Sequence, residues 1–192
     1  MQPIVSFLVP TVDFDKNAIF TVDSILKCNF NFDFEIICCS KKEINYNGVI
    51  WESEPEENRG SVLPINLAYK RASGKYVSLL NDDFTIDNSF VNILNFLDSE
   101  SFPNKIKISA LYPISRLEFN DMKYIIDQVP NGKTLPCQLA CFPVALKSDV
   151  FNYLGRNLLD SRFSHHFSDM YLTYYIYKKF GETIPLCRNA II

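Results

Sequence analysis

The stretch that decides the fold covers residues 58–84 and reads NRGSVLPINLAYKRASGKYVSLLNDDF. Ser61 can cap a helix with an apolar inward stripe, and Gly74 ends that helix. Residues 76–80 form a short apolar run that is typical of a buried strand, and the Asn-Asp-Asp triplet of residues 81–83 follows directly. The stretch therefore predicts a helix, a buried strand and a cluster of oxygen-bearing side chains at the end of that strand.

The first half of the chain alternates between strands and helices. Its strands are predicted over residues 4–9, 34–39, 49–51 and 76–80. After the first strand, Asp13 or Asp15 can cap a helix with apolar positions at Ala18, Ile19, Val22, Ile25 and Leu26. This alternation is typical of a parallel sheet with helices on both faces.

The second half is less regular, and Asp87 caps its first predicted helix. We expect strands over residues 106–111, 138–146 and 183–186, helices over 147–154 and 167–180, and turns within 112–136. No linker-like stretch separates the halves. We therefore expect a single α/β domain over residues 1–192 with one mixed, mainly parallel sheet.

Composition excludes several classes of protein. The 192 residues are 47% hydrophobic with a net charge of -3, which argues against disorder and against a nucleic-acid binder. The apolar runs are too short to span a bilayer, and no signal-like leader opens the chain. None of the six cysteines forms a C-x-x-C pair, and Cys38 and Cys39 lie in a strand as reduced core residues. A cytoplasmic protein is the simplest interpretation, and attachment to a membrane surface or a partner subunit stays open.

Ligands of open parallel sheets bind beyond the carboxyl ends of the strands, where the loops 11–13, 40–43 and 81–83 should meet. Mg²⁺ prefers carboxylates and phosphate oxygens. Asn81 and Asp83 are two residues apart and would point the same way from an extended backbone, with Asp82 on the other side. An ordinary polar turn is the alternative. The buried strand and the upstream helix favour a metal site.

Two further segments carry candidate chemistry. Asn58, Arg59 and Gly60 open a helix, and helix amino termini attract anions. Arg59 is either a phosphate contact or an ordinary solvated arginine, and Asn58 is either a ligand contact or an ordinary turn residue. Asp169 begins an aromatic-rich helix and is either an acid favoured by the helix dipole or a general base. His165 and His166 just before it are loop residues, sugar contacts or metal ligands.

These residues resemble the family 2 glycosyltransferases, which have the GT-A fold. The similarity lies in residues 5–11 (VSFLVPT), residues 35–40 (EIICCS), the spacing of Gly60, Asn66 and Gly74, and the N-x-D version of a D-x-D motif at residues 81–83. In the second half it lies in Gly155, Asp160, Arg162, Phe163 and Asp169.

The resemblance implies an inverting transfer from a nucleotide-sugar donor, with a UDP-sugar preferred, to a glycan or lipid-linked acceptor. It implies Mn²⁺ or Mg²⁺ held by Asp83 with Asn81, and Asp169 as the catalytic base. Residues 1–85 would be the nucleotide-binding half and residues 86–192 the acceptor half, whose aromatic residues offer a contact face for a homo-oligomer. The nucleotide-binding residues it implies are Pro10, Thr11, Asp13, Ser40, Asn58, Gly60, Asn66, Asn81 and Asp82.

The chain departs from the family pattern at four places. Ser40 stands where the family has an Asp that touches the nucleobase, Pro64-Ile65 replace Ala-Arg, Ser168 replaces a Glu, and Tyr171 replaces an Asp. These departures motivate a second hypothesis, a nucleotide-binding protein without turnover. A nucleotidyltransferase ranks last, because residues 10–16 hold only one basic residue and no glycine to grip a triphosphate.

Overall fold

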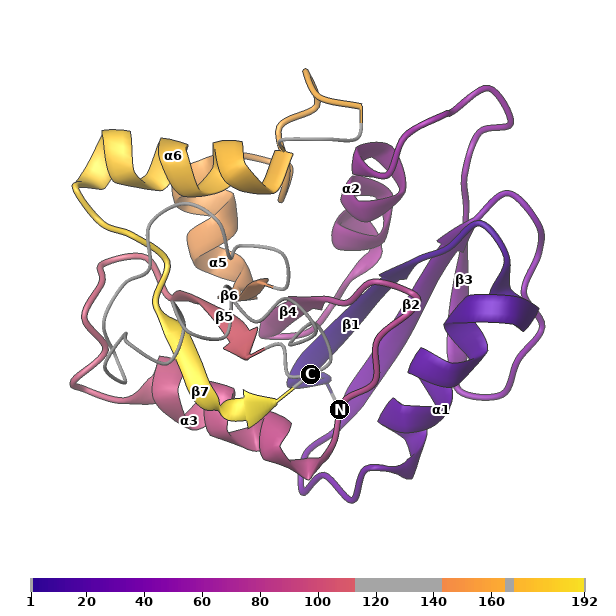
Figure 1. Ribbon diagram of the computed structural model, residues 1–192, viewed down its shortest axis with the longest axis horizontal. Helices are drawn as coiled ribbons and strands as arrows, with labels where there is room; N and C mark the ends of the chain where they lie inside the picture. Colours follow the sequence, from indigo (N-terminus) through magenta and orange to yellow (C-terminus); the bar gives the residue numbers. More distant parts are fainter. Residues whose placement is uncertain (1, 113–142, 165–167, 192) are drawn as a thin grey trace, which may run out of the picture.

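The computed structural model describes residues 2–112, 143–164 and 168–191. In this part of the chain, seven strands form one sheet in the order β3-β2-β1-β4-β6-β5-β7 (Figure 1). The strands are β1 (Val5–Pro10), β2 (Phe34–Ser40), β3 (Val49–Ser53), β4 (Tyr76–Leu79), β5 (Ile108–Tyr112), β6 (Pro143–Leu146) and β7 (Leu186–Ile191). Only β6 runs antiparallel to its two neighbours, β4 and β5. The predicted mixed, mainly parallel α/β sheet is confirmed.

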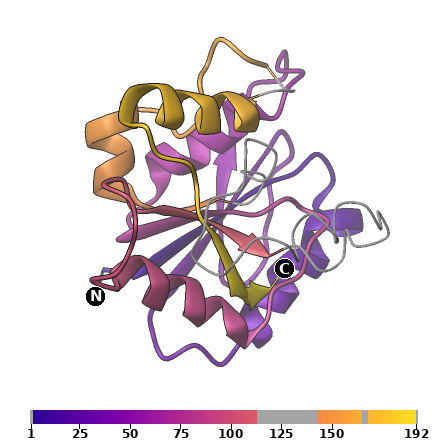
Figure 2. The ribbon, with the colours of Figure 1, turned by 60° about the vertical axis from the view of Figure 1, so that its left-hand side comes forward.

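Helices cover both faces of the sheet. One face carries α2, α5 and α6, and the other carries α1 and α3, so the sheet lies between two helical layers (Figure 2). The helical segments are η1 (Phe14–Ala18), α1 (Ile19–Lys27), α2 (Val62–Arg71), η2 (Asn88–Phe90), α3 (Val91–Asp98), α5 (Lys147–Asp149), η3 (Val150–Leu154) and α6 (Ser168–Phe180).

Alternating side chains of the central strands build two separate cores. Along β1, Phe7 packs among the residues of α1 and α3, whereas Leu8 packs among those of α2 and α6. Cys38 and Cys39 divide in the same way, and both are buried free thiols, as predicted. Burial raises the pKa of each thiol to about 12, so both stay protonated at neutral pH.

The amino ends of β1, β2 and β4 are joined by one partly buried carboxylate, that of Glu35. Glu35 accepts hydrogen bonds from the Ser6 hydroxyl (2.5 Å) and from the Ser73 amide (2.6 Å), and the Gly74 amide donates to the Ser6 hydroxyl (2.8 Å). Burial alone would raise the pKa of Glu35, but these hydrogen bonds outweigh it and lower the pKa. The amino-terminal ends of these strands are therefore held together by hydrogen bonds. The carboxyl-terminal ends stay available for a ligand.

Two details of the first predicted helix differ in the structure. Asp13 precedes a π-helical turn and makes no capping hydrogen bond. Its carboxylate pairs instead with Lys16 at 3.2 Å. Leu26, expected in the inward stripe, is 40% exposed, because Ala18, Val22 and Ile25 already fill the contact with the sheet.

The last strand was predicted too early in the chain. We expected it over residues 183–186, but β7 covers Leu186–Ile191. It is an edge strand that pairs only with β5, so polar residues such as Asn189 can face outward and interrupt the apolar pattern. The predicted strand at 138–146 is described only from Pro143, and the predicted turns at 113–136 lie outside the described residues.

No helix in the described ranges is both long and apolar enough to cross a membrane.

Replacement of Gly74 by alanine should destabilise the fold. A Cβ atom there would lie 2.7 Å from the backbone nitrogen of Ser6 and 2.9 Å from the carbonyl carbon of Val5, neither of which can move without displacing β1. We expect the free energy of unfolding in urea to fall by about 1–3 kcal/mol. Ser53→Ala, at an exposed position of β3, should change it by less than about 0.5 kcal/mol. Equal stabilities for the two variants would contradict this packing.

Candidate functional site

A cavity of about 540 Å³ lies at the carboxyl ends of the first four strands. Its floor is formed by the loops after β1 and β4, which contribute Pro10, Thr11, Val12, Asn81, Asp82 and Asp83. Its opposite wall is formed by the segment before α2, which contributes Asn58, Arg59, Gly60 and Ser61, and by Pro64 in the first turn of α2. The structure therefore brings most of the predicted nucleotide-binding residues and both predicted metal ligands into one cavity.

The acidic loop after β4 is a turn and does not continue the strand. β4 ends at Leu79, and Asp82 and Asp83 form the turn, so the extended backbone on which we based the directions of these side chains is not formed. All three residues of this loop line the same cavity. The Thr11 hydroxyl donates a 2.6 Å hydrogen bond to Asp82, which fixes that carboxylate. Asp83 is exposed, and no described residue forms a hydrogen bond or an ion pair with its carboxylate.

Sequence reasoning missed one cation of the cavity wall, Lys41. Its ammonium group donates to the backbone carbonyls of Glu56 and Asn58, each at 2.8 Å. Arg59 donates to the same two carbonyls, at 2.7 and 2.9 Å. Lys41 was included in the predicted loop 40–43 but was given no role. The two cations place positive charge on the wall of the cavity that also holds the acidic loop.

Three predicted nucleotide-binding residues lie outside this cavity: Asp13, Ser40 and Asn66. Asp13 and Ser40 line a neighbouring hollow of about 300 Å³, which meets the main cavity at Val12. The hydrogen bond from Lys16 lowers the pKa of Asp13 and occupies its carboxylate. The Ser40 hydroxyl donates to the backbone carbonyl of Lys42 at 2.6 Å.

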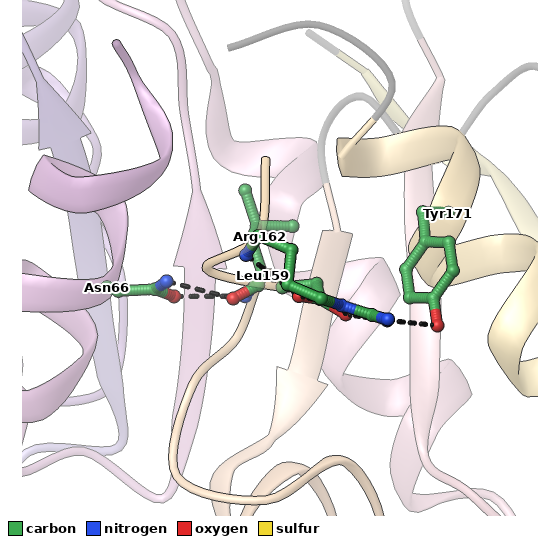
Figure 3. Close-up of polar contacts among 5 residues, drawn as sticks. Asn66, Leu159, Arg162 and Tyr171 are labelled. Atoms are coloured by element: carbon green, nitrogen blue, oxygen red, sulfur yellow. Dashed lines mark hydrogen bonds and ion pairs between the residues drawn. The ribbon is translucent and has the colours of Figure 1, made fainter. Parts of the chain in front are cut away.

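Asn66 was predicted to contact the nucleotide, but in the structure its side chain forms hydrogen bonds within the protein. Its side chain is 3% exposed and does not line the cavity. The amide nitrogen donates to the carbonyl of Leu159 (2.8 Å), and the amide oxygen accepts from the Leu159 N–H (3.0 Å), as Figure 3 shows. Asn66 thus joins α2 to the segment 155–164, 93 residues later.

The same segment is tied to α6. Arg162 forms an ion pair with Asp160 at 2.6 Å and donates to the Tyr171 hydroxyl at 2.6 Å (Figure 3). The Arg162 guanidinium lowers the pKa of Asp160, and the carboxylate in turn raises the pKa of Arg162. Tyr171, a departure from the family pattern, therefore still accepts a hydrogen bond from the segment. Asn66 and Arg162 together connect α2 with α6.

Gly60 is needed for close packing at the start of α2. A Cβ atom there would lie 1.9 Å from the carbonyl oxygen of Ser164. That oxygen accepts a hydrogen bond from the Val62 N–H at 3.2 Å, and Ser61 makes no side-chain cap. One N–H that we expected to bind an anion is therefore satisfied by the protein. The segment that leads to α6 lies directly against the cavity wall.

Three predicted residues are described only in part or lie outside the described residues. Asp169 is the second residue of α6, and its side chain is not described. His165 and His166 lie outside the described residues. Within the described residues, no group of three or more His, Cys, Asp or Glu side chains could hold a metal ion.

Replacement of Asn66 by alanine should lower stability because it leaves the buried N–H and carbonyl of Leu159 without partners. We expect the free energy of unfolding to fall by about 2–4 kcal/mol. Asn92→Ala removes one exposed hydrogen bond, to the Asn189 carbonyl, and should cost less than about 1 kcal/mol. A loss of nucleotide binding by Asn66→Ala with unchanged stability would favour the original prediction.

The chain was compared with known proteins. No protein-family model and no curated protein matches its sequence. Solved structures do match along the whole chain. TarS 1–349 from S. aureus, in complex with UDP-GlcNAc, is 14% identical with a TM-score of 0.69 over 100% of this chain and 58% of TarS 1–349. A mannosyltransferase from Pyrobaculum calidifontis, in complex with GDP-Man and Mn²⁺, is 13% identical with a TM-score of 0.68 over 100% of this chain and 57% of its own.

Glucosyl-3-phosphoglycerate synthase from Mycobacterium tuberculosis, in complex with Mn²⁺ and UDP, is 12% identical with a TM-score of 0.60 over 97% of this chain and 70% of its own. The chain thus spans less than two thirds of the length of TarS 1–349 and of the mannosyltransferase. At these identities the likeness concerns the fold. The mixed seven-stranded sheet and its flanking helices give this chain the GT-A fold.

Proposed function

We propose that this protein is a metal-assisted glycosyltransferase that moves a sugar from a nucleoside-diphosphate donor to an acceptor hydroxyl with inversion. The observation that carries the proposal is the single cavity that joins the acidic loop 81–83 to the wall bearing Lys41 and Arg59. Two proteins of the same fold hold UDP-GlcNAc and GDP-Man in their structures, which supports a nucleotide sugar as the donor.

The cavity suits a donor that lies across the carboxyl ends of the first four strands. Its phosphates would lie between the acidic loop and the two cations. Lys41 and Arg59 currently satisfy backbone carbonyls, and both can turn a donor N–H toward a phosphate because long side chains reorient readily. Lys41 and Arg59 would supply the positive charge that is missing where Pro64 and Ile65 replace the Ala-Arg of the family pattern. Residues 1–85 would thereby form the nucleotide-binding half.

A divalent cation fits the donor set of this loop. Mg²⁺ and Mn²⁺ accept one or two carboxylates together with phosphate oxygens, so a site of three protein acids is not required. Asp83 would hold the ion with the help of Asn81, while Asp82 is kept in place by Thr11. When bound, the ion would neutralise charge that develops on the departing nucleoside diphosphate.

Asp169 is the candidate base on the acceptor side. Ser164 touches Gly60 of the cavity wall, and Asp169 follows five residues later, within about 18 Å even for a fully extended chain. α6 begins on the side of α2 (Figure 1). The acceptor oxygen would attack the anomeric carbon from the face opposite the nucleotide and break its bond to the phosphate oxygen. The Asp169 carboxylate would take the hydroxyl proton, and residues 86–192 would form the acceptor half.

A nucleotide-binding protein without turnover is the second candidate. Its support is that groups expected to bind the nucleotide form hydrogen bonds within the protein instead. Asn66 donates to the Leu159 carbonyl, and the Val62 N–H donates to the Ser164 carbonyl. This candidate shares the cavity, so only measured sugar transfer separates it from the enzyme.

Asp83→Asn should remove metal-dependent donor binding, because an amide is a far weaker cation ligand than a carboxylate. With a panel of nucleotide sugars and Mn²⁺, we expect nucleoside diphosphate release to fall by at least about 100-fold. Asp33→Asn, at an exposed position near the amino edge of the sheet, is the control and should retain full activity. Unchanged activity in Asp83→Asn would exclude the metal role of Asp83.

Asp169→Asn should abolish transfer and spare donor binding. An amide cannot accept the proton of the acceptor hydroxyl, and we expect a loss of about 100-fold or more in the rate. Calorimetry should give the same Kd for the nucleoside diphosphate as in the native protein. A native protein that binds donor yet shows neither transfer nor hydrolysis would instead establish the second candidate.

A further inference from the structure

Glu54 is a buried acid on the wall of the main cavity that the proposed transfer does not use. It directly follows β3, and its N–H donates to the Ser40 carbonyl at 3.0 Å, which continues the pairing of β3 with β2. Its residue exposure is only 9%, yet it lines the cavity. Burying a carboxylate without hydrogen-bond partners is energetically unfavourable, so the partners of Glu54 indicate its role.

Only one hydrogen bond to this carboxylate comes from the described residues. The Asn58 side-chain amide donates to one Glu54 oxygen at 2.5 Å and to the Gly60 carbonyl at 2.6 Å. Both N–H groups of the amide are thereby used. No described residue donates to the second Glu54 oxygen, and Lys41 and Arg59 of the same wall donate to backbone carbonyls instead. One acceptor oxygen therefore stays available on a residue that lines the cavity.

The sheet order places Glu54 at the far end of the cavity from the acidic loop. Glu54 follows β3 and Asp83 follows β4, with β2 and β1 between these strands. Three strand intervals of about 4.8 Å put the two positions about 14 Å apart. A nucleoside diphosphate with its phosphates at Asp83 would extend its base toward Glu54.

We propose that Glu54, oriented by Asn58, selects the nucleobase of the donor by accepting a hydrogen bond from a ring N–H. This inference rests on the proposed function, since it assumes that the cavity binds a nucleotide. Uracil and guanine present such an N–H on their pairing edge. Cytosine and adenine present a ring nitrogen with a lone pair there, which an acidic acceptor repels. Glu54 thus favours UDP- or GDP-sugars over CDP- and ADP-sugars.

Glu54→Gln separates this role from a purely structural one. The Asn58 amide donates to the side-chain oxygen of residue 54 and so would leave the new NH₂ group facing the base, where it can donate to cytosine. We expect the Kd for UDP or GDP, whichever binds the native protein more tightly, to rise about tenfold or more. The Kd for CDP should fall. Glu57→Gln, at an exposed position of the same loop outside the cavity, should change neither value.

The measurement is calorimetry with UDP, GDP, CDP and ADP in the presence of Mn²⁺, on folded variants checked by thermal unfolding. A second arm uses the native protein and the N-methylated analogue of the preferred base, at N3 of uracil or N1 of guanine. The analogue should bind at least about tenfold more weakly to the native protein and about as well as the parent nucleotide to Glu54→Gln.

The outcomes distinguish this inference from the proposed function. An unchanged base preference in Glu54→Gln, or full affinity of the native protein for the methylated analogue, would overturn the role of Glu54 and leave the transferase proposal intact. Nucleotide binding with the expected preference but without sugar transfer would support Glu54 and overturn the transferase. A native protein that binds none of the four nucleotides would overturn both.

Discussion

The clamp between Asn66 and Leu159 is the interaction on which the candidate site depends. It uses both polar ends of one buried amide to hold α2 against a segment 93 residues later. Each hydrogen bond contributes only about 1 kcal/mol to stability. A buried polar group that loses its partner costs more than this, so breaking the clamp is unfavourable. Arg162 extends the connection to Tyr171 of α6. The helix that carries Asp169 is thereby held near the cavity wall that contains Gly60.

The polar groups at the amino-terminal ends of the strands differ from those at the carboxyl-terminal ends. At the amino-terminal ends of the strands, one oxygen of Glu35 accepts hydrogen bonds from Ser6 and Ser73 and so links β1, β2 and the start of β4. At the carboxyl edge, Asp83 has no partner among the described residues, and Glu54 has one. This asymmetry is what an open α/β sheet requires, because its parallel strands bring their carboxyl ends, and the loops after them, to one side.

Much of the fold could be predicted because buried strands leave a strong local pattern. The runs around Phe7, Ile37 and Val77 lie in strands that helices cover on both faces, and their continuous apolar character identifies them without other information. β7 was misplaced because an edge strand tolerates polar residues. The convergence of Thr11, Lys41 and Asp83, which lie in the loops 11–13, 40–43 and 81–83, followed from the rule that parallel strands bring the loops after them to one side of the sheet.

The roles of individual polar residues were harder to predict, since a sequence does not show which partner a side chain will find. Asn66 has the spacing of a binding residue, yet a backbone segment far along the chain takes both of its hydrogen bonds. Lys41 and Glu54 have no distinctive spacing and were missed, although both line the cavity. Such assignments depend on tertiary contacts, which local patterns do not encode.

A crystal structure with a nucleoside diphosphate and Mn²⁺ tests the central claim most directly. The account predicts an anomalous Mn²⁺ peak beside Asp83, the diphosphate over residues 81–83, and the Asp169 carboxylate across the same cavity. A nucleotide bound elsewhere, or an Asp169 side chain that faces away from the diphosphate, would contradict it.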